Sequence, residues 1–315
     1  MSPTVEPVAD APFPGRIAVV GAGAVGAYYG GRLAAAGHEV SFLVRRDYEI
    51  WRQHGLRVRS VQGDFTIRPV RAFRHAGDMG PHDLVVIALK ATANEALAGL
   101  LPPLLHAGTA LLTLQNGLGN DDWLAARFGG DRVFGGLCFT CINRADDGVI
   151  HHFGQGHVAL GEYRRPPGPR AEAMVAAFKA AGVPARTAPD LAAAQWRKLV
   201  WNIPFNGLAI AEGGLDCAGL LADPRIEARA RELMGEVIAS AAAFGYALDP
   251  GLVDQQIEVT KAMGPYRPSS LIDFLAGRPV ELDAIWGEPL RRARAAGCAV
   301  PALARLRDQI RASLG

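Results

Sequence analysis

The chain has 315 residues, of which 50% are hydrophobic and 20% are charged, as in an ordinary soluble globular protein. This length exceeds what one hydrophobic core usually serves, so the sequence predicts two domains. The formal net charge is only +2, and no basic stripe with interleaved aromatic residues is present, so nucleic acid is not an expected partner. No apolar run approaches the roughly 20 residues that span a bilayer, which excludes a membrane-spanning protein.

Residues 1–15 are rich in proline and lack the apolar core of a signal peptide, so we expect a flexible N-terminal tail. The 4 cysteines are too few for a disulfide framework and favour a reducing compartment. These two features predict a cytoplasmic protein.

The first organising unit lies between residues 16 and 44. A short β-branched run at 17–20 leads directly into the sequence GAGAVG, a helical pattern then ends at Gly37, and a second strand follows at 40–44. This is the strand, turn, helix, strand order of a Rossmann dinucleotide-binding unit. The predicted cofactor-binding residues of the turn are Gly21, Ala22, Gly23, Ala24, Val25 and Gly26. The alternative is a purely structural turn between strand and helix.

The end of the second strand indicates which dinucleotide is bound. An NAD site usually has an acidic residue about 20 positions after the glycines, where it binds the ribose hydroxyls. Here the strand ends in Arg45 and Arg46, and no carboxylate precedes Asp47. A guanidinium suits the 2′-phosphate of NADP, whereas a carboxylate would repel it. The pattern favours NADPH/NADP, with a solvated arginine pair as the alternative.

Further strands and helices alternate up to residue 190. The predictions are a buried strand from Asp83, a helix stopped by Pro102 and Pro103, a strand before Gly117, a strand hairpin within 131–163, and a helix and strand within 168–190. Beyond residue 190 the β-like runs disappear, and helices are predicted at 191–212, 223–244, 250–263 and 279–297. The predicted fold is α/β, with an N-terminal Rossmann domain at 16–189 and an all-helical C-terminal domain at 190–315.

Two polar residues stand at the ends of predicted strands. Lys90 ends LVVIALK, and Asn116 ends LLTLQN. The carboxyl ends of parallel strands form the crevice where ligands bind, so both residues are candidates for cofactor and substrate contact. The structural alternatives are a lysine that reaches into solvent and an asparagine that serves a turn.

The helix predicted at 191–212 carries three polar residues in an apolar setting. Lys198, Asn202 and Asn206 follow one another at intervals of four, which places them on one helical face. An ammonium shielded by neighbouring aromatic side chains such as Trp196 and Trp201 should have a lowered pKa. A lowered pKa moves the amine toward the operating pH, where an acid is most effective. The alternative is a lysine that points outward.

A second polar group lies in PSSLIDFLAGRPVELDAI. Ser269 and Ser270 precede an apolar stretch, and Glu281 and Asp283 fall in the first turns of the segment predicted to begin near Pro279. Stabilisation of a helix N-terminus is therefore the alternative role for Glu281.

The cysteines and clustered histidines are not interpreted as sites. Cys138 and Cys141 have CxxC spacing, but on a strand residues three apart face opposite ways, so they, Cys217 and Cys298 are expected to be buried packing residues. The histidines of the predicted hairpin are His151, His152 and His157. No acidic partner is positioned beside them, and no metal site is predicted.

With these motifs in place, the chain resembles the ketopantoate reductase family over essentially its whole length after the tail. The stretches that carry the resemblance are GAGAVG, LVVIALKA, LQNGLG, QWRKLVWN, PSSLIDFLAGRPVELDAI and LRRARAAGCAVP, in this order. The resemblance implies a Rossmann domain, a helical domain and a substrate cleft between them.

The resemblance also implies roles for single residues. Lys198 would be the general acid, and Asn116 and Lys90 would border cofactor and substrate. Asn202 and Asn206 would line the substrate pocket. The remaining implied roles are substrate carboxylate binding by Ser270, completion of the active site by Glu281, and contact with the 2′-phosphate by Arg45.

Three positions depart from the usual family pattern. Gly207 stands where proline is common, Asp273 and Phe274 stand where Gln-Asp is common, and Arg267 stands where asparagine is common. The last two changes are expected near the substrate, and Arg267 would bind a second acidic group or point to solvent.

The expected activity is the NADPH-dependent reduction of 2-dehydropantoate to pantoate in pantothenate and coenzyme A biosynthesis. One alternative is the same chemistry on another small 2-oxo or 3-oxo acid. A second alternative is a non-catalytic NADP-binding redox sensor. The apolar helical domain is also compatible with a homodimer.

Overall fold

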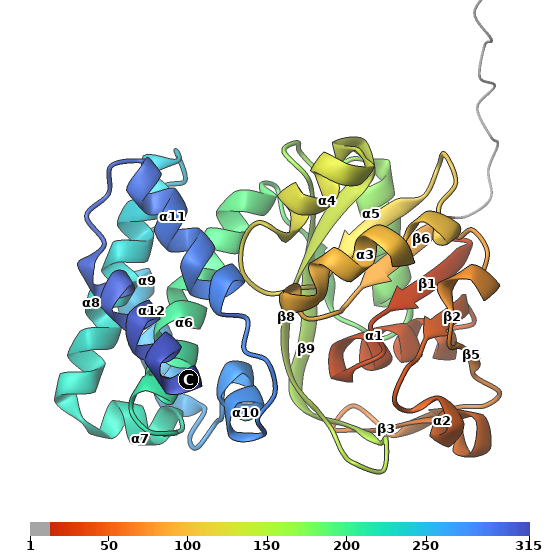
Figure 1. The fold of residues 1–315 in the computed structure, drawn as a ribbon, viewed down its shortest axis with the longest axis horizontal. Coiled ribbons are helices and arrows are strands. Elements are labelled where there is room, and N and C mark those ends of the chain that lie inside the picture. The colour runs from red at the N-terminus through yellow and green to blue at the C-terminus, as the bar shows by residue number, and fades with distance from the viewer. Residues whose placement is uncertain (1–12) are drawn as a thin grey trace, which may run out of the picture.

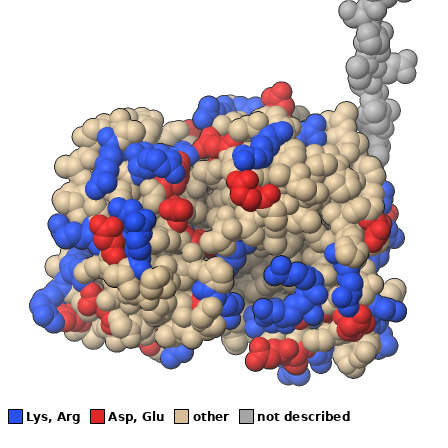
Figure 2. All heavy atoms as spheres, in the orientation of Figure 1, with Lys and Arg blue, Asp and Glu red and all other residues tan. Residues whose placement is uncertain are grey.

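The computed structural model describes residues 13–315, so the predicted tail at 1–15 lies almost entirely outside the described residues. Figure 1 shows two parts side by side, a sheet flanked by helices and a purely helical part. The surface is hollowed where the two parts meet (Figure 2). The predicted combination of an α/β Rossmann region with a helical C-terminal region is therefore confirmed.

The α/β part is built on one ten-stranded sheet with the order β4-β3-β9-β8-β7-β6-β1-β2-β5, and β10 pairs with β9. The strands from β5 to β8 along this path pair in parallel, whereas β8 and β9 form the predicted antiparallel hairpin. The strands are β1 (Arg16–Val20), β2 (Glu39–Leu43), β3 (Leu56–Ser60), β4 (Phe65–Ile67), β5 (Arg71–Phe73), β6 (Leu84–Ile87), β7 (Ala110–Thr113), β8 (Val133–Arg144), β9 (Ile150–Glu162) and β10 (Ala185–Thr187).

Helices cover both faces of this sheet, which explains why its central strands are apolar throughout. Along β1, Ile17 and Val19 pack with α1 and α5, while Ala18 and Val20 pack with α3 and α4. The helices are α1 (Ala24–Ala35), α2 (Tyr48–His54), α3 (Asn94–Leu100), α4 (Asn120–Phe128) and α5 (Pro169–Ala180). Single 3-10 turns lie at η1 (Ala76–Asp78), η2 (Ala91–Ala93), η3 (Pro102–Leu104) and η4 (Gly130–Arg132).

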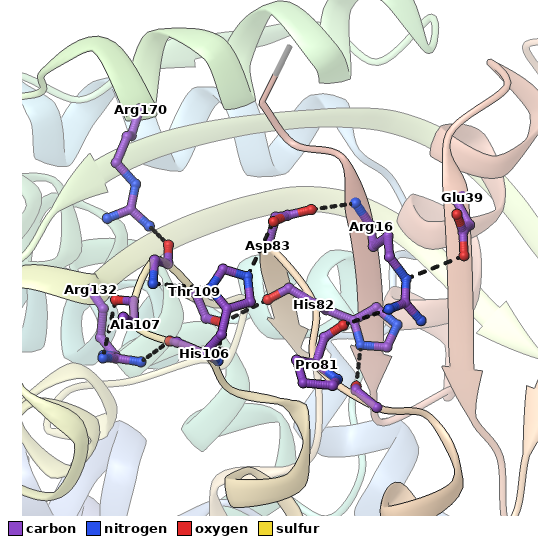
Figure 3. Close-up of polar contacts among 12 residues, drawn as sticks. Arg16, Glu39, Pro81, His82, Asp83, His106, Ala107, Thr109, Arg132 and Arg170 are labelled. Carbon is purple, nitrogen blue, oxygen red and sulfur yellow. Dashed lines mark hydrogen bonds and ion pairs between the residues drawn. The ribbon is translucent and has the colours of Figure 1, made fainter. Parts of the chain in front are cut away.

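A polar network joins the amino ends of the central strands (Figure 3). One carboxylate oxygen of Asp83 accepts from the Arg16 backbone N–H at 2.7 Å, and the other lies 3.1 Å from Nε2 of His106. The Thr109 hydroxyl donates to the His82 carbonyl at 2.7 Å. These contacts fix β1, β6 and β7 at one edge of the sheet, so the opposite, carboxyl edge carries the glycine-rich turn and the predicted ligand crevice.

The helical part packs around one apolar cluster that includes the fully buried Trp286. Its helices are α6 (Leu191–Ala211), α7 (Cys217–Ala222), α8 (Pro224–Ala243), α9 (Leu252–Ala262), α10 (Ser269–Leu275), the π-helical turn η5 (Asp283–Gly287), α11 (Glu288–Ala295) and α12 (Pro301–Leu314). The helix predicted at 279–297 begins several residues later than expected, and Glu281 precedes it.

Candidate active site

The glycine-rich turn has the shape that a dinucleotide pyrophosphate requires. Gly21 has a φ of +102°, and a Cβ there would lie 2.4 Å from the Leu89 nitrogen. A Cβ on Gly26 would lie 2.2 Å from the Gly21 carbonyl oxygen, whereas a Cβ on Gly23 would meet no atom within 4 Å. The first turn of α1 has neither a side-chain cap nor an acidic residue. Its N–H groups and open space therefore fit an anionic cofactor.

The basic residues at the end of β2 form no ion pair with an acidic side chain of the described residues. Arg45 and Arg46 are exposed, whereas the neighbouring Asp47 is buried and forms an ion pair with Arg144 of β8. No ion pair or side-chain hydrogen bond of Arg45 or Arg46 is present within residues 13–315. The adjacent carboxylate of Asp47 is thus neutralised by Arg144, which suits the 2′-phosphate of NADP.

Lys198 reaches across from the helical part to the sheet. It lies on α6, whose N-terminus is capped by Asp190, and its Nζ donates to Oδ1 of Asn116 at 2.8 Å. Burial lowers the pKa of Lys198, while nearby Cys138 and Glu281 act in the opposite direction. The predicted shift of this pKa is confirmed in direction.

The aromatic side chains that shield the Lys198 amine differ in part from those predicted. Trp196 is buried in the helical core, where it stacks on Phe244 at a ring distance of 5.7 Å. Trp201 does line the cleft beside Lys198, and the Lys198 Nζ lies 5.4 Å from the ring centre of Phe139 on β8. The aromatic residue from the sheet, rather than the tryptophan two positions before the lysine, covers the amine.

The loop after β7 holds Asn116 in place through contacts with η5. Gly117 has a φ of +85°, and its Cα is so close to η5 that a Cβ would lie 2.2 Å from the Ala284 carbonyl oxygen. The same carbonyl accepts from the Leu118 N–H at 2.9 Å. On the other side, η5 is joined to α6 because the Trp286 indole donates to the Ile203 carbonyl at 3.0 Å. The acceptor of the Lys198 bond and the helix that carries Lys198 are therefore fixed to the same turn.

A cleft of about 350 Å³ lies between the sheet and the helical part. Of the predicted site residues, those that line it are Val25, Asn116, Lys198, Asn202 and Asn206. The sequence reasoning missed several polar lining residues, namely Gln155, Arg186, Arg197, Gln256, Tyr266 and the hydroxyl-bearing Thr140. Because β9, β10 and α9 converge only in the folded chain, no local motif marks these positions.

The two asparagines on α6 differ in what they contact. Asn206 is buried, and its Oδ1 accepts from the Ser270 backbone N–H at 3.0 Å, which fixes the start of α10. Ser270 is buried and does not line the cleft, whereas the exposed Ser269 does. Asn202 faces both the cleft and a smaller adjoining pocket of about 20 Å³.

Lys90 and Glu281 meet at a second contact between the two parts. The Lys90 Nζ lies 2.5 Å from Oδ2 of Asp273 and 3.4 Å from Oε2 of Glu281. The other Glu281 oxygen accepts from the Ala91 N–H at 2.7 Å, so Glu281 binds the turn after β6 and does not cap its own helix. Burial alone would lower the pKa of Lys90, but the charges of Glu281 and Asp273 outweigh it and raise this pKa.

Two sequence expectations concern residues near the cleft. Of the two alternatives for Arg267, the solvent-facing one agrees with the structure, because Arg267 is exposed and does not line the cleft. Cys138 and Cys141 are only half-buried and both line the cleft; a register shift after Phe139, between the two cysteines, breaks the simple alternation of faces. Cys217 is buried as expected, and Cys298 is half-buried but packs against the helical core, so the packing interpretation holds for these two.

The last points raised by the sequence concern the histidines, metal binding and membrane spanning. His152 packs in the α/β part, with Nδ1 2.8 Å from the Ser60 hydroxyl. Over the described residues, no three His, Cys, Asp or Glu side chains are grouped so that they could hold a metal ion. No helix within residues 13–315 has both the length and the apolar composition needed to cross a membrane.

Comparison with known proteins agrees with this geometry. Residues 17–165 match the family model described as ketopantoate reductase PanE/ApbA, and residues 190–313 match the model of its C-terminal part. A 2-dehydropantoate 2-reductase from a Nostoc species is 38% identical over 94% of each chain. The crystal structure of 2-dehydropantoate 2-reductase from Geobacter metallireducens superposes with a TM-score of 0.92 at 45% identity, covering 95% of this chain and 99% of that one.

A more distant structure, D-mandelate dehydrogenase in complex with NADH, superposes with a TM-score of 0.84. It covers 95% of this chain and 98% of its own, but at 22% identity it shares the fold alone. The two family models together cover most of the chain. On this basis the chain is an oxidoreductase that belongs to the ketopantoate reductase family.

Proposed function

We propose that this protein reduces 2-dehydropantoate to pantoate with NADPH, a step of pantothenate and coenzyme A biosynthesis. The observation that carries the proposal is the 2.8 Å contact of the Lys198 amine with Asn116 inside the cleft, at the carboxyl end of β7. This contact puts a proton donor next to the sheet edge where a Rossmann fold binds its cofactor. The family membership supplies the substrate class.

The cofactor site is formed by the glycine-rich turn and the end of β2. The free N–H groups of α1 and the open space at Gly23 would hold the pyrophosphate. Arg45 would bind the 2′-phosphate, because the adjacent Asp47 is already paired. When bound, NADPH supplies the hydride.

Lys198 would deliver the proton. Reduction of a ketone places negative charge on its oxygen, which an ammonium at the reacting centre stabilises and then protonates. Burial lowers the pKa of Lys198 toward the working pH, where an acid is most effective. Asn116 holds the amine toward the sheet and would border the nicotinamide.

The other predicted residues would seat the substrate and close the site. Asn202 is a neutral donor and acceptor in the cleft, suited to a hydroxyl or carboxylate of the oxo acid. Asn206 fixes the turn that begins at Ser269 and Ser270. Lys90 and Glu281 would fix the position of the helical part relative to the sheet beside the reacting atoms.

The test follows NADPH oxidation by its nicotinamide absorbance with 2-dehydropantoate as substrate. We expect Lys198→Ala to lose most turnover, by about 100-fold or more, because general acid catalysis contributes about this much. NADPH binding should persist, and Lys179→Ala, on the exposed end of α5, is the matched control with unchanged activity. Near-normal kcat in Lys198→Ala would refute the proposed acid.

The same assay separates the competing functions. A higher kcat/KM for another 2-oxo or 3-oxo acid than for 2-dehydropantoate would assign the chemistry to that substrate. Tight NADPH binding with no oxidation by any oxo acid would indicate a redox sensor. Because all four cysteines are free thiols, we also propose a reducing, cytoplasmic location.

A further inference from the structure

Two arginines line the cleft from opposite walls. Arg186 comes from β10 at the edge of the sheet, and Arg197 comes from α6, one residue before Lys198. The cleft lining contains three cationic residues, Arg186, Arg197 and Lys198, and among the described residues no aspartate or glutamate is part of it. The cleft therefore has a one-sided positive charge, although the chain as a whole carries only +2.

Neither arginine is neutralised by a neighbour. Arg292 of α11, by contrast, is paired with both Asp122 and Glu288. In the described part of the chain, Arg186 and Arg197 take part in no ion pair and no side-chain hydrogen bond. An exposed guanidinium without a carboxylate partner has its positive charge and its N–H donors available to bind a ligand.

The histidine near these cations, His157, adds no further charge. His157 stacks on Phe139 at a ring distance of 4.6 Å, and Phe139 in turn lies under the Lys198 amine. Burial, followed by the charges of Arg186 and Lys198, lowers the pKa of His157, so its imidazole is neutral at pH 7. The neighbouring polar residues of the lining, Gln155 and Gln256, are uncharged.

The shape of the cleft strengthens the field of these cations. Walls of low dielectric, here Phe139, Trp201 and Val259, focus field lines along a cleft lined by one sign of charge. Such an arrangement raises the local concentration of an anion by about 10-fold or more. The small oxo acids of the proposed reaction are carboxylates.

We propose that Arg186 and Arg197 form an anion-receiving mouth of the cleft, which draws the carboxylate of the oxo acid toward Lys198 and contributes to substrate capture but not to hydride transfer. This inference rests on the proposed function for the identity of the substrate. It assigns a specificity role, selection of free carboxylates over uncharged ketones, to two residues outside the predicted catalytic set.

The kinetic test compares wild type with R186Q, R197Q and the double variant R186Q/R197Q. R294Q, which removes one exposed charge from α11 away from the cleft, is the matched control. Each is assayed with 2-dehydropantoate and with its uncharged cyclic ester, ketopantolactone, at about 20 mM and about 500 mM salt, which spans strong and weak ionic screening.

We expect the double variant to raise KM for 2-dehydropantoate about tenfold at low salt with kcat unchanged. The difference should shrink to less than about twofold at high salt, because ions screen exposed charges. KM for ketopantolactone and for NADPH should stay the same, and R294Q should behave as wild type. An equal effect on the lactone, a loss of NADPH affinity instead, or no change in KM would overturn the inference.

A binding measurement distinguishes failure of this inference from failure of the proposed function. Isothermal titration calorimetry with 2-dehydropantoate, in the presence of NADP, gives a dissociation constant without turnover. Binding to wild type without NADPH oxidation would remove the proposed function alone. Equal binding by wild type and the double variant would remove the anion-receiving mouth alone, and absence of binding to wild type would remove both.

Discussion

Replacement of Gly117 by alanine tests whether contact with η5 positions Asn116, which we propose borders the reacting atoms. Gly117 directly follows Asn116, which accepts the hydrogen bond from Lys198 at 2.8 Å. An alanine Cβ there would lie 2.2 Å from the carbonyl oxygen and 2.4 Å from the carbonyl carbon of Ala284. These are backbone atoms, so no side-chain rotation can relieve the collision.

The magnitude follows from two separate costs. A non-glycine residue in the left-handed region costs about 1–2 kcal/mol, and Gly117 has a φ of +85°. Overpacking in a well-packed region costs about 1–3 kcal/mol more. We therefore expect Gly117→Ala to lower the free energy of unfolding by about 2–5 kcal/mol. The loop that relieves the collision carries Asn116 with it, and a displacement of about 1 Å can reduce kcat about 100-fold.

Gly119→Ala is the matched control, because this glycine lies in the same loop with a φ of +87°. A Cβ there would only touch Glu288 at 3.4 Å, which is an ordinary contact. Its expected cost is therefore about 1–2 kcal/mol from backbone strain, with kcat preserved. Urea denaturation measures the free energies of unfolding, NADPH oxidation measures kcat, and NADPH binding shows that the sheet is intact. If both variants lost the same stability and the same kcat, the argument that η5 positions Asn116 would be refuted.

Three further outcomes are expected. Burial lowers the pKa of Lys198, and its protonated amine is the proposed acid. We therefore expect kcat for reduction to be full below that pKa and to fall as pH rises through it, at a pH below 10.5; a flat pH profile would exclude the role. Arg45→Gln should weaken NADPH binding about 10-fold or more, as expected for a charged hydrogen bond of about 1.5–3 kcal/mol, while NADH binding stays unchanged and R294Q has no effect; equal weakening of both cofactors would contradict a 2′-phosphate contact. Gly207→Ala should lower the free energy of unfolding by about 1–3 kcal/mol, because its Cβ would lie 2.7 Å from Leu306 in the helical core, and an unchanged urea midpoint would contradict this packing.

Local patterns in the sequence were sufficient to predict the helices, strands and turns on which the site residues lie. The glycine-rich turn is recognisable because a strand, a tight turn and a helix need particular residues at fixed spacing, and the structure places Gly21, Gly23 and Gly26 accordingly. The four-residue interval on α6 likewise placed Lys198, Asn202 and Asn206 on one face, and all three line the cleft. Such periodicities are properties of a single element and need no tertiary information.

Pairing between distant elements was decided only by the tertiary structure. Lys90 is 183 positions from Asp273 and 191 from Glu281, and neither contact follows from a local pattern. Glu281 was therefore open to interpretation as a helix-stabilising residue, whereas it binds the turn after β6. The shielding of Lys198 by Phe139 depends in the same way on how β8 lies against α6.

The lining of the cleft shows most clearly what the local sequence determines and what only the tertiary structure determines. The sequence indicated candidate side chains for hydride-transfer chemistry, because their types and spacing are set by short stretches of chain. Tertiary structure determined that Arg186, Arg197, Cys138 and Cys141 face the same cleft, since β-bulges on β8 and the convergence of β10 with α6 set their directions. The direction of a side chain at a bulge or at the meeting of two parts depends on packing between segments far apart in sequence.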